Sequence, residues 1–158
     1  MKKEAAYQVK AISRDTDKLA IARTILEALP EWFGLPESTE AYIAGSRGKP
    51  FFCAYDGANP VGFAYLKETG RDTAELAVIG VLQPYHRLGI GRSLFAEAKK
   101  EAKKSGYSFL QVKTVQMGRY ACYDRTNRFY LSLGFQEFEV METLWDRQNP
   151  SQIYIMAI

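Results

Sequence analysis

The sequence predicts a single α/β domain, built on a mixed central sheet of about seven strands with helices on both faces. Two observations support this prediction. The chain has 158 residues, the size of one domain with one core, and no repeat or Pro/Gly/Ser-rich linker divides it. Segments with strand periodicity and segments with helix periodicity follow one another in the order β-α-α-β-β-β-α-β-α-β-β. We therefore expect one domain over residues 1–158.

The beginning of the chain is predicted to hold one strand and two helices. Residues 6–12 alternate with a period of two, as a half-buried strand does. The next segment has helical periodicity up to Pro30, and Asp15 or Asp17 can cap its start. A shorter helix over about 38–45 is expected to end at the glycines that follow. The inner face of the first helix is predicted to consist of Leu19, Ala22, Leu26 and Leu29.

In the middle of the chain the period changes to that of strands. The apolar runs 51–55 and 61–66 are predicted to be neighbouring strands, because the Asp-Gly and Asn-Pro pairs of residues 56–60 favour a turn between them. A third strand is expected over about 73–81.

The remaining elements alternate between helices and strands. A turn with two glycines opens a helix over about 91–105, which Gly106 ends. A strand over 108–115 and a helix over about 124–133 follow. Two closing strands are expected over 135–145 and 153–158, with a loop over 146–151 between them.

Composition and charge exclude several classes of protein. Hydrophobic residues make up 47% of the chain and charged residues 25%, which excludes a disordered tail, a collagenous repeat and a coiled coil. The 21 basic residues exceed the 18 acidic residues by a formal charge of +3. So small a surplus disfavours a nucleic-acid-binding domain, but it is compatible with a modest-sized anionic ligand.

The cysteine, histidine and hydropathy patterns lead to expectations about compartment and metals. Cys53 and Cys122 form no disulfide framework, and the apolar run around Cys53 predicts a buried free thiol. A structural zinc site is hard to build with one histidine, so we expect no metal. No stretch approaches the ~20 apolar residues of a membrane span, and residues 1–4 lead into no signal-type apolar region. We therefore expect a reduced, soluble, cytoplasmic protein.

The most informative segment is a strand–turn–helix junction that carries Gly89 and Gly91. Unpaired backbone N–H groups at a helix N-terminus converge on one point and favour an anion there. Glycine allows the backbone to approach a phosphate without a Cβ atom in the way. His86, Arg87 and Arg92 would add charge-assisted hydrogen bonds. The junction therefore predicts an anion site.

Two common nucleotide-binding motifs fit this junction poorly. A Rossmann site needs a third glycine where Leu94 stands, and a Walker loop needs Gly-Lys-Ser/Thr where the chain has Gly91-Arg92-Ser93. The junction instead resembles the acyl-CoA-binding signature of the GNAT superfamily of N-acetyltransferases, Arg/Gln-x-x-Gly-x-Gly/Ala at the end of a central strand. Here the signature is His86-Arg87-Leu88-Gly89-Ile90-Gly91, with His in place of the first Arg or Gln.

A second segment resembles the same family. The run Asn127-Arg128-Phe129-Tyr130-Leu131-Ser132-Leu133-Gly134-Phe135 is similar to the late helix and turn of GNAT proteins, which end in Tyr-x-x-x-Gly-Phe. Thr126 and Tyr123 stand where the family usually has Ala and Asn. The two segments occur in the family's order, about forty residues apart. The predicted order of elements also matches the GNAT fold along nearly the whole chain.

The resemblance implies direct transfer of an acetyl or other acyl group from CoA to an amine, without a covalent enzyme intermediate. It places the CoA pyrophosphate on the backbone N–H groups of Arg87 to Arg92 and the pantetheine arm along Ile79 to Val81. A backbone N–H near Val81 would stabilise the developing oxyanion of the thioester. The cofactor-binding candidates are Ile79, Gly80, Val81, His86, Arg87, Leu88, Gly89, Ile90, Gly91, Arg92 and Asn127.

Two residues are candidates for proton transfer. Tyr130 matches the general-acid tyrosine of the family, which protonates the leaving CoA thiolate, and a phenol with its ordinary pKa near 10 stays protonated at pH 7. Glu75 is the best candidate for a base that receives the amine proton, directly or through a water. Strand alternation predicts that Glu75, Ala77 and Ile79 share one face.

The acceptor is expected to be an amine of a small molecule or of a protein. In this fold the first two helices, their connection and the last strand pair select it. Arg125 and Arg128 could meet the 3′-phosphate of CoA, and strands such as 153–158 could pair in a homodimer. A transferase that uses a longer acyl-CoA and a regulatory protein that binds acyl-CoA without catalysis remain alternatives. The acceptor regions contain Trp32, Phe33, Tyr42, Glu142 and Trp145.

Overall fold

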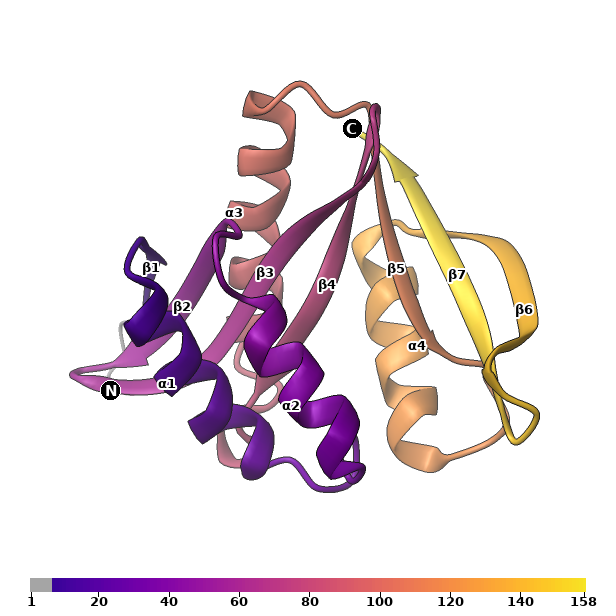
Figure 1. The fold of residues 1–158 in the computed structure, drawn as a ribbon, viewed down its shortest axis with the longest axis horizontal. Coiled ribbons are helices and arrows are strands. Elements are labelled where there is room, and N and C mark those ends of the chain that lie inside the picture. The colour runs from indigo at the N-terminus through magenta and orange to yellow at the C-terminus, as the bar shows by residue number, and fades with distance from the viewer. Residues whose placement is uncertain (1–6) are drawn as a thin grey trace, which may run out of the picture.

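The computed structural model describes residues 7–158, which form one seven-stranded mixed sheet with helices on both faces. This architecture and the predicted order of elements are confirmed (Figure 1). The strands of the described part are β1 (Gln8–Ile12), β2 (Phe51–Asp56), β3 (Asn59–Gly70), β4 (Thr73–Val81), β5 (Phe109–Val115), β6 (Gln136–Asp146) and β7 (Asn149–Ala157). Its α-helices are α1 (Asp15–Glu27), α2 (Pro36–Gly45), α3 (Ile90–Lys104) and α4 (Ala121–Leu133).

The sheet has the strand order β1-β2-β3-β4-β5-β7-β6. Its first four strands are antiparallel neighbours, and so are its last three. The two halves meet at the parallel pair β4–β5, which is joined only at Thr73↔Phe109, Ala74↔Leu110 and Glu75↔Gln111. Beyond these pairs the two strands diverge, as Figure 1 shows.

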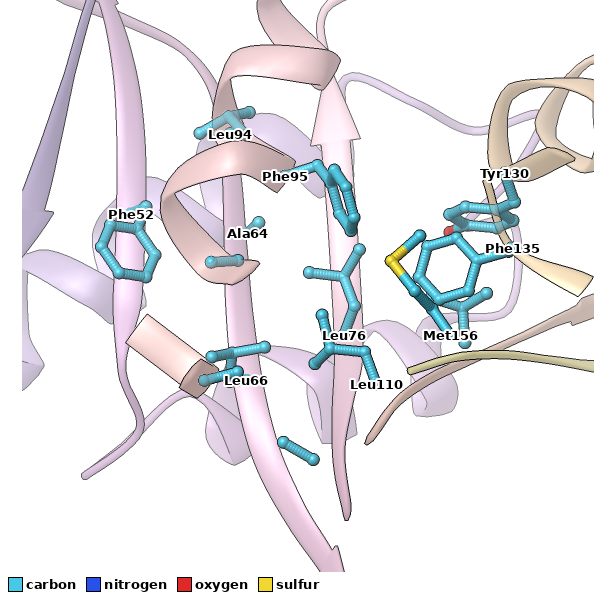
Figure 2. Packing of buried hydrophobic residues seen from close by; sticks show 14 of the residues in the cluster. Phe52, Ala64, Leu66, Leu76, Leu94, Phe95, Leu110, Tyr130, Phe135 and Met156 are labelled. Atoms are coloured by element: carbon cyan, nitrogen blue, oxygen red, sulfur yellow. The ribbon is translucent and has the colours of Figure 1, made fainter. Parts of the chain in front are cut away.

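Two hydrophobic cores lie on opposite faces of the sheet. Helices α1 and α2 pack on one face of β2, β3 and β4. Helix α3 packs on the other face, in a core that continues to α4, β5 and β7. Figure 2 shows this second core, where Leu94 and Phe95 of α3 face the strand residues and Tyr130, Phe135 and Met156 lie beside Phe95. Burial of this apolar surface is the main force that holds the helices to the sheet.

A β-bulge in β4 changes which of its side chains share a face. Tyr65 of β3 pairs with Val78, whereas the next residue, Leu66, pairs with Leu76. The extra residue reverses the alternation. Leu76 and Ile79 therefore belong to the core under α3, and Val78 belongs to the core under α1. The prediction that Glu75, Ala77 and Ile79 share one face is wrong for this reason.

The C-terminal hairpin also differs from the prediction. The expected loop over 146–151 is a tight turn at Arg147 and Gln148, because Asp146 accepts hydrogen bonds from the backbone N–H groups of Gln148 and Asn149. Strand β7 consequently starts at Asn149 and lies between β5 and β6. It is an interior strand, so the prediction that the strand over 153–158 could pair in a homodimer is wrong, because neither of its edges is free. The edge strands of the sheet are β1 and β6.

At the N-terminal end, neither Asp15 nor Asp17 caps the first helix. Arg14 is the N-cap of α1, and the carboxylate of Asp15 accepts a hydrogen bond from Gly48 N instead of capping the helix. The predicted start of the first strand at Ala6 lies outside the described residues. Residues 1–4, for which no signal segment was expected, lie outside them as well. Within residues 7–158, no helix combines the length and the apolar character that crossing a bilayer requires.

Candidate active site

A cleft opens where β4 and β5 diverge. It has a volume of about 1640 Å³ and is lined by residues 77–81 of β4 and 113–115 of β5. The start of α3 and the length of α4 border it, and so does the α1–α2 segment, by which we mean residues 29–35. Because β4 has no strand partner on its β5 side after Glu75, the backbone of its last residues faces the cleft with one edge unpaired. An extended ligand can pair there as an additional strand does.

The turn before α3 presents a row of free amide groups to this cleft. Ser93 makes the first backbone hydrogen bond of the helix, to Gly89 O at 3.0 Å. The N–H groups of residues 87–92 donate to no backbone oxygen among residues 7–158. Gly89 (φ 82°) and Arg87 (φ 62°) both have left-handed backbone conformations, which turn neighbouring amides in one direction. This amide loop, residues 86–92, has a backbone geometry that favours binding of an anion.

The amide loop is held in place from two sides. A Cβ atom on Gly91 would lie 3.0 Å from the Phe129 ring, so α3 and α4 are in direct contact at this position. On the other side, the His86 imidazole hydrogen-bonds the carbonyl oxygen of Val81 and packs edge-on against Trp32, with ring centroids 5.7 Å apart. His86 thus ties the loop to the end of β4 and to the α1–α2 segment.

Tyr130 lies in the cleft wall, on α4. Its side chain is 6% exposed and its ring packs against Phe129, Phe135 and Tyr154. Its hydroxyl has no hydrogen-bond partner among residues 7–158. Burial, and secondarily the negative charge of Glu75, raise the pKa of Tyr130 far above its ordinary value of 10. The hydroxyl is therefore a protonated donor that remains free for a ligand.

Glu75 is buried at the base of the β4–β5 divergence. Its carboxylate is 3.2 Å from Lys113 Nζ and 3.7 Å from Lys67 Nζ. It does not itself line the cleft, whereas Lys113 does. The Glu75 charge also contributes to raising the pKa of Tyr42, after burial. Glu75 is therefore close enough to the cleft to influence two of its tyrosines.

The comparisons with known proteins identify the family. The sequence model of the acetyltransferase (GNAT) domain matches residues 47–137, more than half of the chain. The chain belongs to the GNAT family. It is therefore an acyltransferase. No curated protein sequence matches the chain.

Solved GNAT structures have the same fold over almost the whole chain. A GNAT-family protein from Desulfovibrio desulfuricans superposes with a TM-score of 0.83 at 21% identity, covering 96% of this chain and 99% of that one. The ribosomal-protein-S18-alanine N-acetyltransferase from Escherichia coli gives 0.76 at 23% identity, covering 97% and 94%. A GNAT acetyltransferase from Elizabethkingia anophelis with acetyl-CoA bound gives 0.75 at 16% identity, covering 96% and 98%.

The GNAT cleft brings together most of the predicted cofactor residues. Leu88 and Asn127 are the two that do not line it. Leu88 is exposed on the amide loop. Asn127 is fully buried: its amide donates to Val115 O and Tyr123 O, and its Oδ1 accepts from the Tyr154 hydroxyl. The residues that do line the cleft are Ile79, Gly80, Val81, His86, Arg87, Gly89, Ile90, Gly91 and Arg92.

On the opposite side of the cleft, the α1–α2 segment is tied to the start of α4. The indole N–H of Trp32 donates to Thr126 Oγ1 (3.2 Å) and Cys122 O (3.3 Å). In return, the Tyr123 hydroxyl donates to Trp32 O at 2.6 Å. These bonds join residues about ninety positions apart, so no local pattern in the sequence could have indicated them. Tyr123 was noted only as a departure from the family pattern, and it is a cleft residue.

Four of the five residues expected to select the acceptor line the cleft: Trp32, Phe33, Tyr42 and Trp145. Glu142 does not. Arg125 and Arg128 both line the cleft. Arg125 in addition pairs with Glu31 and lies over the Trp32 ring. Among residues 7–158, no group of three His, Cys, Asp or Glu side chains is arranged to hold a metal ion.

Proposed function

We propose that the protein transfers an acetyl group from acetyl-CoA to a primary amine, in a ternary complex and without a covalent enzyme intermediate. The observation that carries this proposal is the single cleft between β4 and β5. It joins an amide loop suited to a pyrophosphate with a buried, protonated Tyr130 whose hydroxyl is free. The cleft thus offers groups for the pyrophosphate and for the leaving thiolate, and Glu75 lies directly behind its wall.

The amide loop and the end of β4 are the proposed binding site of acetyl-CoA. The N–H groups of residues 87–92 would hold the pyrophosphate, with Arg87 and Arg92 as counter-charges. The open edge of Ile79 to Val81 would pair with the pantetheine arm, and a backbone N–H near Val81 would stabilise the thioester oxygen as it gains negative charge. We assign Asn127 to the interior of the domain and not to this site.

Tyr130 is the proposed general acid. The neutral amine nitrogen attacks the thioester carbonyl carbon and forms the new C–N bond, the C–S bond breaks, and the CoA thiolate receives the proton of the Tyr130 hydroxyl. The nitrogen carries one surplus proton after the attack and releases it to solvent, and the Tyr130 phenolate takes a proton back. Tyr130 keeps its proton until the thiolate forms, because burial raises the pKa of the phenol. Burial also disfavours a thiolate anion in the same cleft, and this favours transfer of the proton to the sulfur.

Glu75 is the proposed acceptor of the amine proton, through a water, because the carboxylate lies behind the cleft wall and not on it. Its nearest cation, Lys113, does reach the cleft. A water between the amine and the Glu75 carboxylate would carry the proton. The pair Glu75–Lys113 would then mark where the amine enters the cleft.

The test is a measurement of CoA release with thiol detection, on a panel of amines, polyamines, amino acids and peptides. Acetyl-CoA binding is measured separately by calorimetry. Amine-dependent CoA release supports the proposal, whereas tight acetyl-CoA binding without release from any amine would favour the regulatory alternative. Repeating the assay with propionyl-, butyryl- and octanoyl-CoA decides the acyl length. A higher kcat/KM for one of these than for acetyl-CoA would mean that the longer acyl-CoA is the donor.

We also propose that the protein acts in the cytoplasm. Cys53 and Cys122 are both free and buried, which fits a reducing compartment. Fractionation of cells that express the tagged chain, with a cytoplasmic marker enzyme as the reference, tests the location.

A further inference from the structure

We propose that the acceptor is a primary amine carried on an aromatic or bulky apolar body, an inference that rests on the proposed acetyl transfer. It starts from the part of the cleft that lies away from the amide loop. This part, called the acceptor side below, is bordered by the α1–α2 segment, the start of α4 and the end of β6. Its side chains are mostly apolar and aromatic, and its charges are already paired.

The mouth of the acceptor side gathers exposed apolar side chains from three separate segments. Leu35 follows α1 and is 66% exposed, Tyr120 precedes α4, and Leu144 and Trp145 (42% exposed) lie at the end of β6. Residues 142–145 of β6 have no partner in β7, since Met141 pairs with Ser151 and Asp146 with Asn149. Apolar surface that converges from three segments on one cleft marks a binding surface.

The inner wall of the acceptor side is aromatic and fixed. It consists of Trp32, Phe33, Tyr42 and Tyr123. Phe33 packs edge-on against Tyr42 at 5.9 Å, and the hydrogen bonds between Trp32, Tyr123 and α4 hold the indole in place. Because the wall is already ordered, an apolar ligand would bind without a large cost of ordering these side chains.

The acidic groups near this wall have ion-pair or hydrogen-bond partners within the protein. Glu31 lies 3.5 Å from Arg125, and Lys113 lies 3.2 Å from Glu75. Both oxygens of Asp146 accept hydrogen bonds within the β6–β7 turn. Among the described residues that line the cleft, Glu31 and Asp146 are the acidic ones, so a second ammonium of a polyamine would find no unengaged carboxylate.

The aromatic wall suits both parts of the proposed acceptor. An aromatic or branched apolar body would bury its surface against the rings, which favours its binding. The amine arrives as an ammonium, and ring faces attract cations. A polar or doubly charged amine would gain the second interaction only. We therefore expect at least a tenfold difference in kcat/KM between the two classes.

The first experiment compares acceptors that present the same primary amine. The aromatic probes are 2-phenylethylamine and tryptamine, and they are compared with ethanolamine and spermidine. The peptide Phe-Ala-Ala-amide is included to distinguish a small-molecule amine from the N-terminus of a peptide chain. We expect kcat/KM to be at least tenfold higher for the aromatic amines, or for the aromatic peptide if the source is a chain N-terminus. A preference for ethanolamine or spermidine would overturn the inference while leaving acetyl transfer intact.

The second experiment changes the mouth. Trp145→Ala should raise KM for the preferred aromatic amine about tenfold and change kcat less than twofold, and KM for ethanolamine should stay the same. Phe138→Ala is the matched control: Phe138 is on the same strand and 63% exposed, but it does not line the cleft. Equal kinetics for the two variants would contradict the proposed contact.

The third experiment separates acceptor binding from transfer. Both tryptophans of the chain, Trp32 and Trp145, line the cleft, so intrinsic fluorescence reports directly on acceptor binding. With CoA present, 2-phenylethylamine should cause a saturable change that Trp145→Phe reduces, and spermidine should cause none. Saturable binding without turnover would refute the transfer and keep the acceptor class. A change with spermidine alone would refute the acceptor class.

Discussion

Tyr130 and Glu75 differ in how they meet the cleft. The hydroxyl of Tyr130 is part of the cleft wall and has no protein partner among the described residues, whereas the carboxylate of Glu75 lies behind the wall and is paired with two lysines. Removal of either group should therefore affect the reaction in a different way. The phenol would act on the leaving thiolate, and the carboxylate would act on the entering amine.

Tyr130→Phe should lower kcat tenfold or more and leave the Kd of acetyl-CoA within twofold. The substitution removes one hydroxyl that makes no hydrogen bond to residues 7–158 and keeps the ring contacts with Phe129, Phe135 and Tyr154. General acid catalysis by a positioned group contributes about 10²–10⁴-fold. Steady-state kinetics and calorimetry measure the two quantities, and wild-type turnover in the variant would refute the role.

The pH dependence of kcat/KM should separate the acid from the base. Since burial raises the pKa of Tyr130, its proton stays on throughout the neutral and moderately alkaline range. We expect the wild-type rate to rise with pH as the amine loses its proton, with no fall below about pH 10. In Glu75→Gln the rate should be lowest relative to wild type near pH 7 and recover at high pH, where the amine is already neutral.

The comparison variant for this profile is Lys67→Gln, which removes the exposed lysine beside Glu75 and leaves the carboxylate in place. Its profile should follow that of the wild type. If Glu75→Gln and wild type gave superimposable profiles, Glu75 would have no part in proton transfer.

Individual residues were predictable from the sequence where their role depends on near neighbours. The free amides around Gly89 and the spacing of Tyr130 from Gly134-Phe135 can be derived from the chain alone. Lys113 and Tyr123 could not be found in this way, because their place in the cleft depends on how β5 and α4 lie relative to the α1–α2 segment. The burial of Asn127 is likewise a property of contacts between distant segments.

At the scale of elements, the site depends on the contact between α3 and α4. Gly91 allows the two helices to approach closely, because a Cβ atom there would come within 3.0 Å of the Phe129 ring. Arg92 adds a hydrogen bond to Ser132 Oγ at 3.3 Å. The amide loop is therefore positioned by a helix that follows it in sequence by some thirty residues.

Gly91→Ala should raise the Kd of acetyl-CoA about tenfold, because the added methyl group pushes the start of α3 away from α4 and shifts the amide loop. Calorimetry measures the affinity. Gly70→Ala is the control, since no atom lies within 4 Å of a Cβ atom at that position. In the double variant Gly91→Ala/Phe129→Leu, the smaller side chain should restore much of the affinity; no recovery would mean that another contact causes the loss.

The elements themselves were largely predictable, and the exceptions have physical reasons. Strand β4 has the predicted bounds because alternation and flanking turns mark a strand locally. Its bulge was not predicted, since a bulge is a mismatch in length between two strands and the other strand is not visible in a local pattern. The β6–β7 turn was predicted too long because Asn149-Pro150-Ser151 has the composition of a turn. In the structure this segment pairs with β5 and β6 and therefore belongs to strand β7.

At the scale of the whole molecule, Asn127 joins the C-terminal half of the sheet to α4. Asn127→Leu removes two donated hydrogen bonds and leaves the Tyr154 hydroxyl without its acceptor. We expect the free energy of unfolding to fall by about 2–4 kcal/mol, because each buried polar group left unpaired costs about 1–3 kcal/mol. Chemical denaturation measures this change.

Tyr154→Phe serves as the graded control, since it removes only one of the three bonds and should cost about 1 kcal/mol. At temperatures where both variants are folded, their affinity for acetyl-CoA should match that of the wild type. A variant Asn127→Leu with unchanged stability and lost affinity would instead place Asn127 at the cofactor.

The short β4–β5 ladder also affects how firmly the two parts of the sheet are held together. Among the described residues, three residue pairs of β4 and β5 and the hydrogen bonds that Ser108 N and Phe109 N donate to Asp72 O join a four-stranded block to a three-stranded block. Beyond Glu75, the edge of β4 that faces the cleft has no strand partner. A pantetheine arm bound along this edge would supply the hydrogen-bond partners that a neighbouring strand supplies elsewhere in the sheet. It would connect the two blocks by hydrogen bonds and slow hydrogen exchange of the amides in Ile79 to Val81 that face the cleft. Binding of the donor would therefore also stabilise the fold.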